Sequence, residues 1–266
     1  MEPHLGFGIT AQRDPAAVGV ARLAAGLERL GYDELWANDG RLGSGLATLS
    51  AAAATTERID LCLGVAPLSD KTAAAIAAEV QQLRLPPARL VLGVGTGAGK
   101  SLAAVRDAVA ELRRLLPDVR LAVAALGPGM CALAGEIADV VLLNWCFPDR
   151  IAWSRERIAA GATAVGRATP RVAGYVRVAF GPGATERLTA EAERYRDRPR
   201  PYDRLLDAQG AAERGAPGVT SDDPAKVPAL LAPYRTALDS CVVRALATDP
   251  SAAGWLEIAA AATLRA

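Results

Sequence analysis

Histidine is almost missing from this sequence, since His4 is the only one among 266 residues. A Ser-His-Asp triad, a Cys-His pair or a zinc site built on several histidines would have to use this one residue, and nothing near it in the sequence supports such a site. We therefore expect no metal site of this kind, and we expect any catalysis to rely on a cofactor.

Cysteine is also scarce, and no two cysteines form a C-x-x-C pair. Cys62, Cys131, Cys146 and Cys241 are scattered, and each lies in or beside an apolar run. This distribution does not indicate a redox motif or a cysteine-based metal site. It predicts buried free thiols.

Two further absences concern the surroundings of the protein. No stretch of about 18 apolar residues occurs, and the N-terminus lacks a basic segment followed by an apolar one. The formal net charge of +1 gives no reason to expect a nucleic acid or an anionic membrane as partner. We expect a cytoplasmic protein that acts on a small-molecule substrate.

What the chain does have is a regular alternation of strand-like and helix-like segments. Eight segments have the character of strands: Leu5–Thr10, Glu34–Asn38, Ile59–Ala66, Leu90–Val94, Leu121–Ala125, Val140–Asn144, Val172–Phe180 and Cys241–Ala245. Eight parallel strands with intervening helices predict an α/β fold, a (β/α)8 TIM barrel that forms a single domain over residues 1–266. An open doubly wound sheet is the alternative.

Local signals predict where some connections begin. Asp14 and Pro15 have the residue types of an N-cap and a first helical residue, so the first helix is expected to begin there. After the seventh strand, the arginines and prolines of Arg194–Arg204 predict a solvated stretch.

The stretch RLVLGVGTGAGKSLAAV (Arg89–Val105) looks like a nucleotide-binding loop, but its spacing is wrong. A P-loop needs four residues between its first glycine and the Gly-Lys pair. Here Gly95 leaves three residues before Gly99, and Gly93 leaves five. The dinucleotide fingerprint also fails by one residue. Because such loops work by aiming consecutive backbone N–H groups at phosphate, neither motif is indicated.

The place of this loop suggests two other roles. The loop follows the fourth strand, at the face where (β/α)8 barrels build their sites. Gly95, Thr96 and Gly97 either let a ligand approach the backbone closely or form a tight turn. In both cases the spacing predicts that Lys100 is dispensable for ligand binding.

Five segments follow one another along the predicted strands: LERLGYDELWAND (Leu27–Asp39), TTERIDLCLGVAPL (Thr55–Leu68), ARLVLGVGTG (Ala88–Gly97), AALGPGMCALAGEIADVVLLNW (Ala124–Trp145) and DSCVVRAL (Asp239–Leu246). Together they resemble one family, the luciferase-like monooxygenase superfamily. The fourth segment resembles the branch that depends on the deazaflavin coenzyme F420. The resemblance implies a (β/α)8 barrel that binds F420 or FMN at the carboxyl ends of its strands, often as a homodimer.

The chain departs from the family pattern in two places. Family members usually carry a long insertion after strand four, whereas here the next helix follows within a few residues. In many F420 enzymes strand two ends in an acidic residue and a histidine, but this chain reads Asn38-Asp39-Gly40. If Gly40 takes the histidine's place, the usual imidazole proton donor is absent.

The resemblance and the residues together suggest a set of site residues. Asn38 and Asp39 end the second strand and are the candidate catalytic residues, with an N-cap role as the alternative for Asp39. The resemblance places a bulge or a non-prolyl cis bond at Gly64 and Val65, against the cofactor ring. The remaining candidate cofactor-binding residues are Gly95, Thr96, Gly97, Ala125, Gly127, Pro128, Gly129, Met130 and Asn144.

Two of these predictions have a physical basis of their own. The stretch Ala125–Met130 leads into a helix whose first N–H groups and positive dipole end favour a phosphate, although a plain Gly-Pro turn is the alternative. In the eighth strand, Arg244 faces either a phosphate or carboxylate of a ligand, or a nearby acid of the protein.

These observations predict an oxidoreductase that transfers two electrons between a cofactor and a small organic substrate. Coenzyme F420 is preferred to FMN because of the segment Ala124–Trp145. A non-catalytic or degenerate flavin-binding barrel is the alternative, favoured by Gly40 and by the short loop after strand four. A sugar-phosphate lyase or isomerase lacks the Lys, His and Glu residues it would need.

Overall fold

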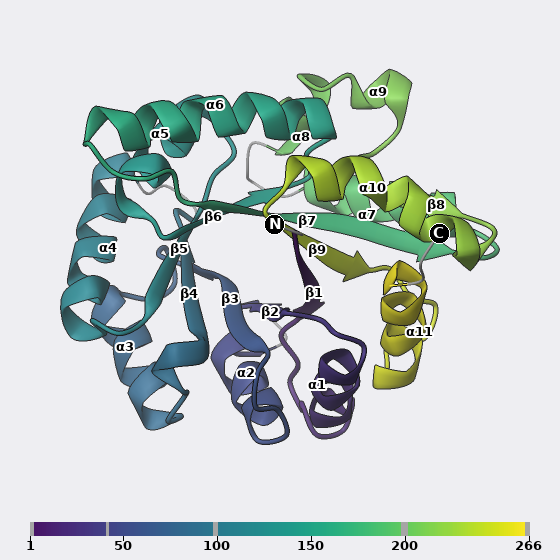
Figure 1. The fold of residues 1–266 in the computed structure, drawn as a ribbon, viewed down its shortest axis with the longest axis horizontal. Coiled ribbons are helices and arrows are strands. Elements are labelled where there is room, and N and C mark those ends of the chain that lie inside the picture. The colour runs from purple at the N-terminus through teal and green to yellow at the C-terminus, as the bar shows by residue number, and fades with distance from the viewer. Residues whose placement is uncertain (1–2, 41–42, 98–100, 198–201, 264–266) are drawn as a thin grey trace.

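Eight parallel strands close into a barrel in the computed structural model, and helices cover its outside (Figure 1). The structure describes residues 3–40, 43–97, 101–197 and 202–263. The strands follow one another around the barrel from β1 to β7; β9 then pairs with both β7 and β1. Because β6 also pairs with β7, the sheet has no break, and the open doubly wound alternative is wrong. The predicted (β/α)8 barrel is confirmed.

The barrel strands agree with the predicted segments to within a residue or two. Their bounds are β1 (His4–Thr10), β2 (Glu34–Asn38), β3 (Asp60–Pro67), β4 (Leu90–Gly95), β5 (Arg120–Ala124), β6 (Val140–Asn144), β7 (Arg171–Phe180) and β9 (Ser240–Ala245). His4, expected to precede the first strand, is its first residue. The extra strand β8 (Val219–Ser221) pairs only with the carboxyl end of β7 and lies outside the barrel order.

Helices connect these strands along the chain. They are α1 (Val20–Arg29), α2 (Gly45–Ala53), α3 (Ala73–Gln82), α4 (Leu102–Leu115), α5 (Pro128–Ile137), α6 (Pro148–Ala164), α7 (Ala184–Arg196), α8 (Tyr202–Asp207), α9 (Ala211–Arg214), α10 (Val227–Ala237) and α11 (Ala252–Thr263), with short 3-10 helices at Pro87–Arg89 and Pro224–Lys226. Within the described ranges, none of them has both the length and the apolar character that a membrane span requires.

The start of α1 differs from the prediction. Asp14 Oδ1 does accept hydrogen bonds from the N–H groups of Ala16 and Ala17, at 3.1 Å each. These bonds close a turn rather than a helix, because Gly19 adopts a left-handed backbone with φ 74°. The helix therefore begins at Val20, five residues after Pro15.

The passage after β7 is also more ordered than predicted. Within Arg194–Arg204, residues 198–201 lie outside the described residues. Beyond them α8 begins, and its residues Tyr202, Leu205 and Leu206 are buried in one cluster with Trp145 and Leu188. Within the predicted range, Arg194, Asp197, Asp203 and Arg204 are exposed, as a solvated stretch requires, and the prediction is wrong only for Tyr202, which is buried.

The barrel interior is filled in layers, as alternation of side chains along each strand requires. Nine buried residues form its central apolar cluster: Trp36, Cys62, Val91, Ala122, Val140, Leu142, Ala173, Tyr175 and Val242. A larger apolar core lies between the strands and the helices. All four cysteines are free and buried, as predicted. Burial raises the pKa of Cys146 and of Cys241 to about 12, so these thiols stay protonated at neutral pH.

At the amino ends of the strands, buried charges are neutralised within the barrel. Glu34 is fully buried; it forms an ion pair with Arg171 and accepts hydrogen bonds from Trp36 Nε1 at 2.6 Å and Ser240 Oγ at 3.0 Å. Arg120 binds both oxygens of Asp60, at 2.8 and 2.9 Å. Ion pairs thus neutralise the charges of Glu34 and Asp60 at this end, which is typical of the stabilising face of a TIM barrel.

Helices α5 and α6 pack backbone to backbone, which requires glycine on both. A Cβ on Gly135 would overlap the carbonyl oxygen of Ile158, and a Cβ on Gly161 would overlap that of Ala132. Alanine is otherwise the better helix former, so only the packing makes these positions intolerant.

We expect Gly161→Ala to lower the free energy of unfolding by about 1–3 kcal/mol, since the helices must separate to admit the methyl group. Gly127→Ala is the matched control, because no atom lies within 4 Å of the added Cβ there. Urea denaturation of both variants measures the difference. A Gly161→Ala protein as stable as the control would contradict the close packing.

Candidate functional site at the barrel mouth

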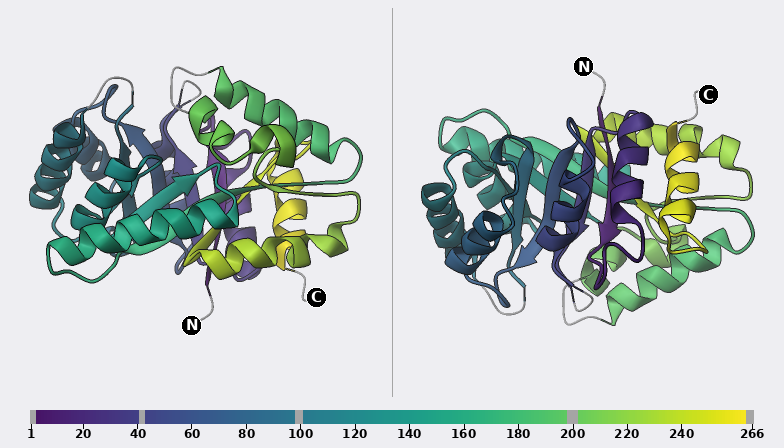
Figure 2. Two further views of the ribbon diagram at one scale, coloured as in Figure 1. Left: turned by 90° about the horizontal axis from the view of Figure 1, so that it is seen from above. Right: turned by 90° about the horizontal axis from the view of Figure 1, so that it is seen from below.

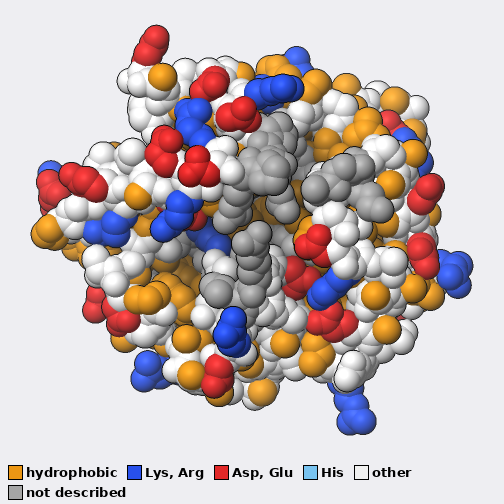
Figure 3. Space-filling model, turned by 180° about the vertical axis from the view of Figure 1, so that it is seen from behind, with side chains coloured by type: hydrophobic (Ala, Val, Ile, Leu, Met, Phe, Trp, Pro, Cys, Tyr) orange, Lys and Arg blue, Asp and Glu red, His pale blue; other side chains and the backbone are white. Residues whose placement is uncertain are grey.

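The carboxyl ends of the barrel strands share one face, opposite the end at which the N-terminus lies (Figure 2). We call this end the barrel mouth, and Figure 3 shows the molecule from that side. Its inward positions are Thr10, Asn38, Gly64, Gly95, Ala124, Asn144, Arg177 and Arg244. Active sites of (β/α)8 barrels are built at this face.

At the end of β2, Asn38 contacts Arg244, which is distant in the sequence. Its Oδ1 accepts a hydrogen bond of 3.1 Å from Arg244 Nη2, and its Nδ2 donates to the Asp39 carbonyl oxygen at 3.0 Å. Arg244 Nη2 also donates to Thr10 Oγ1 at 2.6 Å. Asn38 therefore orients Arg244 within the mouth.

Asp39 is held by the protein on both carboxylate oxygens. Oδ1 accepts the Gly45 N–H at 2.6 Å, at the start of α2, and Oδ2 lies 2.8 Å from Lys71 Nζ. Lys71 also pairs with Glu79 at 2.7 Å. Burial lowers the pKa of Lys71, but the two carboxylates outweigh it and raise the pKa above the ordinary lysine value. The N-cap of α2 is Ser44, so Asp39 is not the cap and instead anchors the turn before α2 through Gly45 and Lys71.

Gly40, the position where the resembled family often has histidine, is exposed and uncrowded. The nearest atom to an added Cβ is Asn38 Nδ2, at 3.7 Å. The backbone of Gly40 pairs with Gly43 in an isolated bridge. A side chain at this position would therefore have room, so packing does not require glycine at residue 40.

The end of β3 has the irregularity that the resemblance implied. The Gly64–Val65 peptide bond is cis, and the register with β4 shifts between Leu63 and Ala66. Tyr175 donates a hydrogen bond of 2.8 Å from its hydroxyl to the Gly64 carbonyl oxygen. A Cβ on Gly64 would lie 2.5 Å from that hydroxyl and 2.6 Å from Trp36 Cε3, so internal packing requires this glycine. Contact of Gly64 and Val65 with a cofactor ring stays a prediction.

The glycine loop after β4 is explained largely by its own packing. A Cβ on Gly95 would lie 3.0 Å from Val65 Cγ2, and one on Gly97 would overlap Ser69 Oγ. Gly97 also has a left-handed backbone, with φ 63°. These contacts, with the half-buried Thr96 between them, fit the tight-turn interpretation. Lys100 lies outside the described residues.

The start of α5 is the candidate position with open space. Ala125 is buried, and Gly127 is the N-cap of α5 but offers no side chain to the first N–H groups. Among the described residues no atom lies within 4 Å of a Cβ on Gly127, whereas one on Gly129 would meet Leu102 Cδ1 at 3.3 Å. Pro128 begins the helix. An anion can therefore approach this terminus along Gly127, where the helix dipole favours it.

Asn144 and Trp145 at the end of β6 position a second arginine. Asn144 Oδ1 accepts a hydrogen bond from Arg177 Nη1, and its Nδ2 donates to Tyr202 at 3.0 Å. Trp145 is fully buried with φ 57°, an unusual value for a bulky residue. Its ring lies 3.8 Å from the Arg177 guanidinium. Trp145 is thus a packing residue, and it fixes one face of Arg177.

Arg177 and Arg244 are neighbours in register on the inner face of β7 and β9. They are 1% and 8% exposed. Burial and the charge of Arg244 lower the pKa of Arg177, while the nearby Tyr195 and Glu191 oppose this. Among the described residues no carboxylate forms an ion pair with either arginine. The expectation that Arg244 pairs with a nearby acid of the protein is therefore wrong for this part of the chain.

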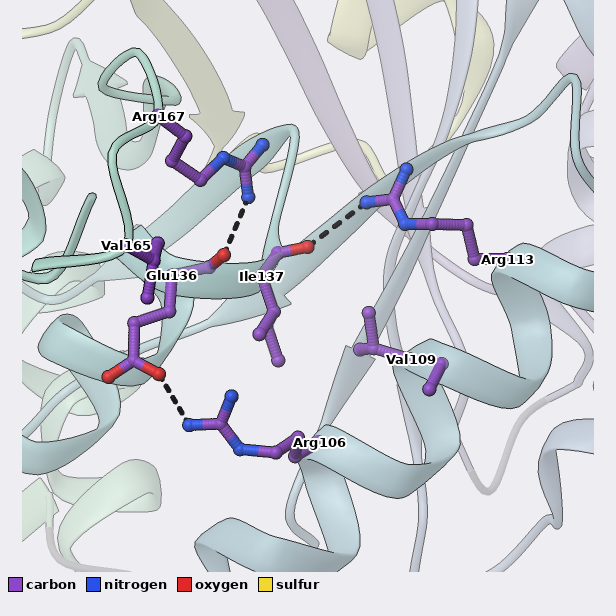
Figure 4. A pocket seen from close by; sticks show the side chains of 8 residues that line it. Arg106, Val109, Arg113, Glu136, Ile137, Val165 and Arg167 are labelled. Carbon is purple, nitrogen blue, oxygen red and sulfur yellow. Dashed lines mark hydrogen bonds and ion pairs between the residues drawn. The ribbon is translucent and has the colours of Figure 1, made fainter. Parts of the chain in front are cut away.

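A hollow of about 600 Å³ elsewhere on the surface is a weaker candidate site (Figure 4). It lies between α4, α5 and the end of α6, near the carboxyl ends of these helices and away from the barrel mouth. Its arginines already bind protein groups: Arg106 binds Glu136, Arg113 binds the Ile137 carbonyl oxygen, and Arg167 binds that of Glu136. Because each of these arginines is already bonded to a protein group, the hollow does not show the uncompensated charge that would indicate a ligand.

Comparison with known families agrees with this barrel. The family model described as luciferase-like monooxygenase matches residues 4–115 and 103–229. The chain belongs to the luciferase-like monooxygenase family. The matched ranges run from β1 to the first residues of α10, so they include the barrel strands β1 to β7.

One curated relative and several solved structures are similar to the chain. The 5,10-methylenetetrahydromethanopterin reductase of Methanolobus tindarius is 27% identical over an alignment of 197 residues, and the match covers 60% of this chain and 60% of the reductase. The match therefore spans less than two thirds of that relative's length.

The solved structures share the fold. The coenzyme F420-dependent tetrahydromethanopterin reductase of Methanopyrus kandleri is 18% identical with a TM-score of 0.78, covering 97% of this chain and 98% of that one. An F420-dependent secondary alcohol dehydrogenase, solved with an F420–acetone adduct, has a TM-score of 0.79 at 16% identity and covers 98% and 99%. The oxygenating constituent of 3,6-diketocamphane monooxygenase from Pseudomonas putida, in complex with FMN, has a TM-score of 0.71 at 16% identity and covers 98% and 97%.

Sequence reasoning overlooked Arg177, which the structure places beside Asn144. A signal was present: Arg171, Tyr175 and Arg177 lie at even spacing in an otherwise apolar strand, so all three face the barrel interior. A charged residue at the inward end of a buried strand is unusual enough to mark a site.

The contacts of Asp39 lead to a stability prediction. We expect Asp39→Ala to lower the free energy of unfolding by about 1–2 kcal/mol, because it removes both the bond to Gly45 and the charge that faces Lys71. Asp39→Asn keeps an oxygen for Gly45 and should cost less. The exposed Asp70, whose Oδ1 accepts only from Ser69, is the matched control, and its alanine variant should stay within about 0.5 kcal/mol. Equal effects of Asp39→Ala and Asp70→Ala in urea denaturation would refute the anchoring role.

Proposed function

We propose that this chain is an oxidoreductase that binds coenzyme F420, or alternatively FMN, at the barrel mouth and acts on a small organic substrate by hydride transfer. The observation that carries the proposal is the family match over residues 4–115 and 103–229. A cytoplasmic location, a homodimeric assembly and a single domain over residues 1–266 remain parts of the proposal.

Coenzyme F420 is the preferred cofactor for two reasons. The reductase of Methanolobus tindarius is a relative in sequence, and two of the similar solved structures are named as F420-dependent. The FMN complex of the Pseudomonas putida protein keeps FMN as the alternative. When bound, either group supplies two-electron chemistry at its ring.

The residues present at the mouth fit such a group. The uncapped start of α5 and the open space at Gly127 suit a phosphate, which both cofactors carry. The inward end of β3, with Gly64 held by Tyr175, offers a fixed backbone edge next to which a ring can lie. Asn144 and Asn38 are already bonded to Arg177 and Arg244, so their role toward a cofactor is to hold these arginines.

The proton balance of the reaction does not involve histidine. His4 lies at the amino end of β1, at the opposite end of the barrel, where its Nδ1 is 3.7 Å from Glu34 Oε1. Asp39 already forms an ion pair with Lys71 and accepts the Gly45 N–H, so both of its carboxylate oxygens are engaged by the protein. A substrate that needs a proton after accepting the hydride therefore takes it from water, or the substrate needs none. The protein's task is to hold the reacting atoms about 3–3.5 Å apart.

The phosphate site generates a binding prediction. We expect Gly127→Val to lower the affinity for F420 and for FMN tenfold or more, which is about 1.4 kcal/mol of binding free energy. Riboflavin, which has no phosphate, should bind as before. Gly127 is a better test than Gly129, since an added Cβ at Gly127 meets no atom of the described residues within 4 Å, whereas one at Gly129 meets Leu102 at 3.3 Å. Quenching of fluorescence on titration measures each affinity, with the exposed Ala103→Val as control variant. Equal weakening of FMN and riboflavin would mean that Gly127 does not face the phosphate.

The position of His4 generates a kinetic prediction. We expect His4→Ala to change the rate at which the reduced cofactor is oxidised by menadione by less than about tenfold, or ~1.4 kcal/mol in activation free energy. Absorbance of the cofactor follows the reaction, and thermal unfolding checks that the variant is folded. A folded but inactive His4→Ala protein would overturn the histidine-free mechanism. Binding of cofactor without any turnover would instead favour the non-catalytic barrel, the alternative that Gly40 suggests.

A further inference from the structure

The barrel mouth holds two buried positive charges for which the described part of the chain supplies no counter-ion. Arg177 donates to the neutral Asn144, and Arg244 donates to the neutral Thr10 and Asn38. The charged neighbours that remain are balanced elsewhere: Asp39 by Lys71, and Glu191 by Arg194. Buried charges are normally paired, so this arrangement is costly for the protein alone.

At the opposite end of the same two strands, the arginine of β7 has a carboxylate as its partner. Arg171 on β7 faces Glu34, and Ser240 on β9 donates to the same carboxylate. Six residues further along β7, Arg177 has no such acid within the described residues. The same inner surface thus has neutralised charge at its amino end and uncompensated positive charge at its carboxyl end.

Each arginine also keeps a donor that no protein group accepts. Arg177 Nε and Arg244 Nη1 are buried and lack a hydrogen-bond partner among the described residues. Both side chains are nevertheless fixed in place. Trp145 stacks on Arg177 at 3.8 Å, and the Tyr175 ring lies 5.5 Å from the Arg244 guanidinium. Two immobile guanidinium groups with unused donors form a preorganised anion site.

We propose that Arg177 and Arg244 together bind a carboxylate group of the substrate, so that the acceptor in this reaction is an organic acid. The inference rests on the proposed function and adds the chemical class of the substrate. Guanidinium groups match planar carboxylates geometrically, and their attraction is strongest where water is excluded. Thr10, Asn38 and Asn144 are positioning residues that hold the two forks at the correct angle.

The cofactor phosphate is a less suitable occupant of this pair. The open approach at Gly127 belongs to the end of β5, and β6 and β7 separate that strand from β9. A phosphate held at α5 therefore leaves the arginine pair on the other side of β6 without an anion. A carboxylate on the substrate supplies it and orients the substrate toward the middle of the mouth.

Titration with malonate tests the inference without any cofactor. Malonate and malonamide have nearly the same shape and differ in charge, so only malonate should raise the midpoint of thermal unfolding and change the tryptophan fluorescence, through Trp145. Arg244→Gln and Arg177→Met should each lower the affinity for malonate at least tenfold. The matched control is Arg106→Gln, which removes the same charge from the surface pair with Glu136 and should leave malonate affinity unchanged.

A second readout separates an anion site from a merely structural role. Since each charge is uncompensated, Arg177→Met, which keeps the stacking on Trp145, should raise the thermal stability of the protein without ligand. A structural arginine would show a loss of stability instead. Arg244→Lys, which keeps the charge but loses the fork, should bind malonate more weakly than the unchanged chain but better than Arg244→Gln.

Several outcomes would overturn the inference. One is equal binding of malonate and malonamide; another is malonate affinity that Arg177→Met and Arg244→Gln leave unchanged. A third is that malonate does not bind and both variants lose F420 or FMN tenfold, which would assign the arginines to the cofactor. Cofactor titration of the unchanged chain decides the proposed function separately, because malonate binding does not require a cofactor.

Discussion

Pairing of β9 with both β7 and β1 closes the barrel, and this closure determines which side chains can meet inside it. Once the strands are in register, alternate residues of β7 must line the interior from one end to the other: Arg171, Ala173, Tyr175 and Arg177. The partner strand supplies Ser240, Val242 and Arg244 at matching levels. The same register therefore sets an ion pair at one end, an apolar middle and two arginines at the other.

The two ends of the barrel differ in how their charges are treated, and this difference separates stability from chemistry. At the amino end, the carboxylates of Glu34 and Asp60 neutralise the charges of Arg171 and Arg120. At the carboxyl end, neutral groups hold Arg177 and Arg244 in place, but no carboxylate of the described residues neutralises their charges. A natural protein retains such a destabilising arrangement where a ligand completes it.

Much of the fold was predictable, because the strands of a (β/α)8 barrel are short apolar runs bounded by turn residues. Glu34–Asn38 and Val140–Asn144 were predicted with the bounds that the structure has. The start of α1 was not, since the left-handed Gly19 overrides the favourable Asp14-Pro15 pair. For the site, sequence patterns located the strand ends but not the partners. That Asp39 faces Lys71, or that Asn144 holds Arg177, depends on residues brought together only by folding.

Side chains of the segment between β7 and β9 bond to the end of β6 and to the residues that follow it. Gln209 donates from Nε2 to the Trp145 carbonyl oxygen at 2.9 Å and accepts the Phe147 N–H, also at 2.9 Å. Tyr202, seven residues earlier, bonds Asn144 and thereby stabilises the support of Arg177. The barrel itself does not depend on these bonds. Changes in this segment would therefore alter the support of Arg177 at the mouth while the strand pairing of the barrel stays as it is.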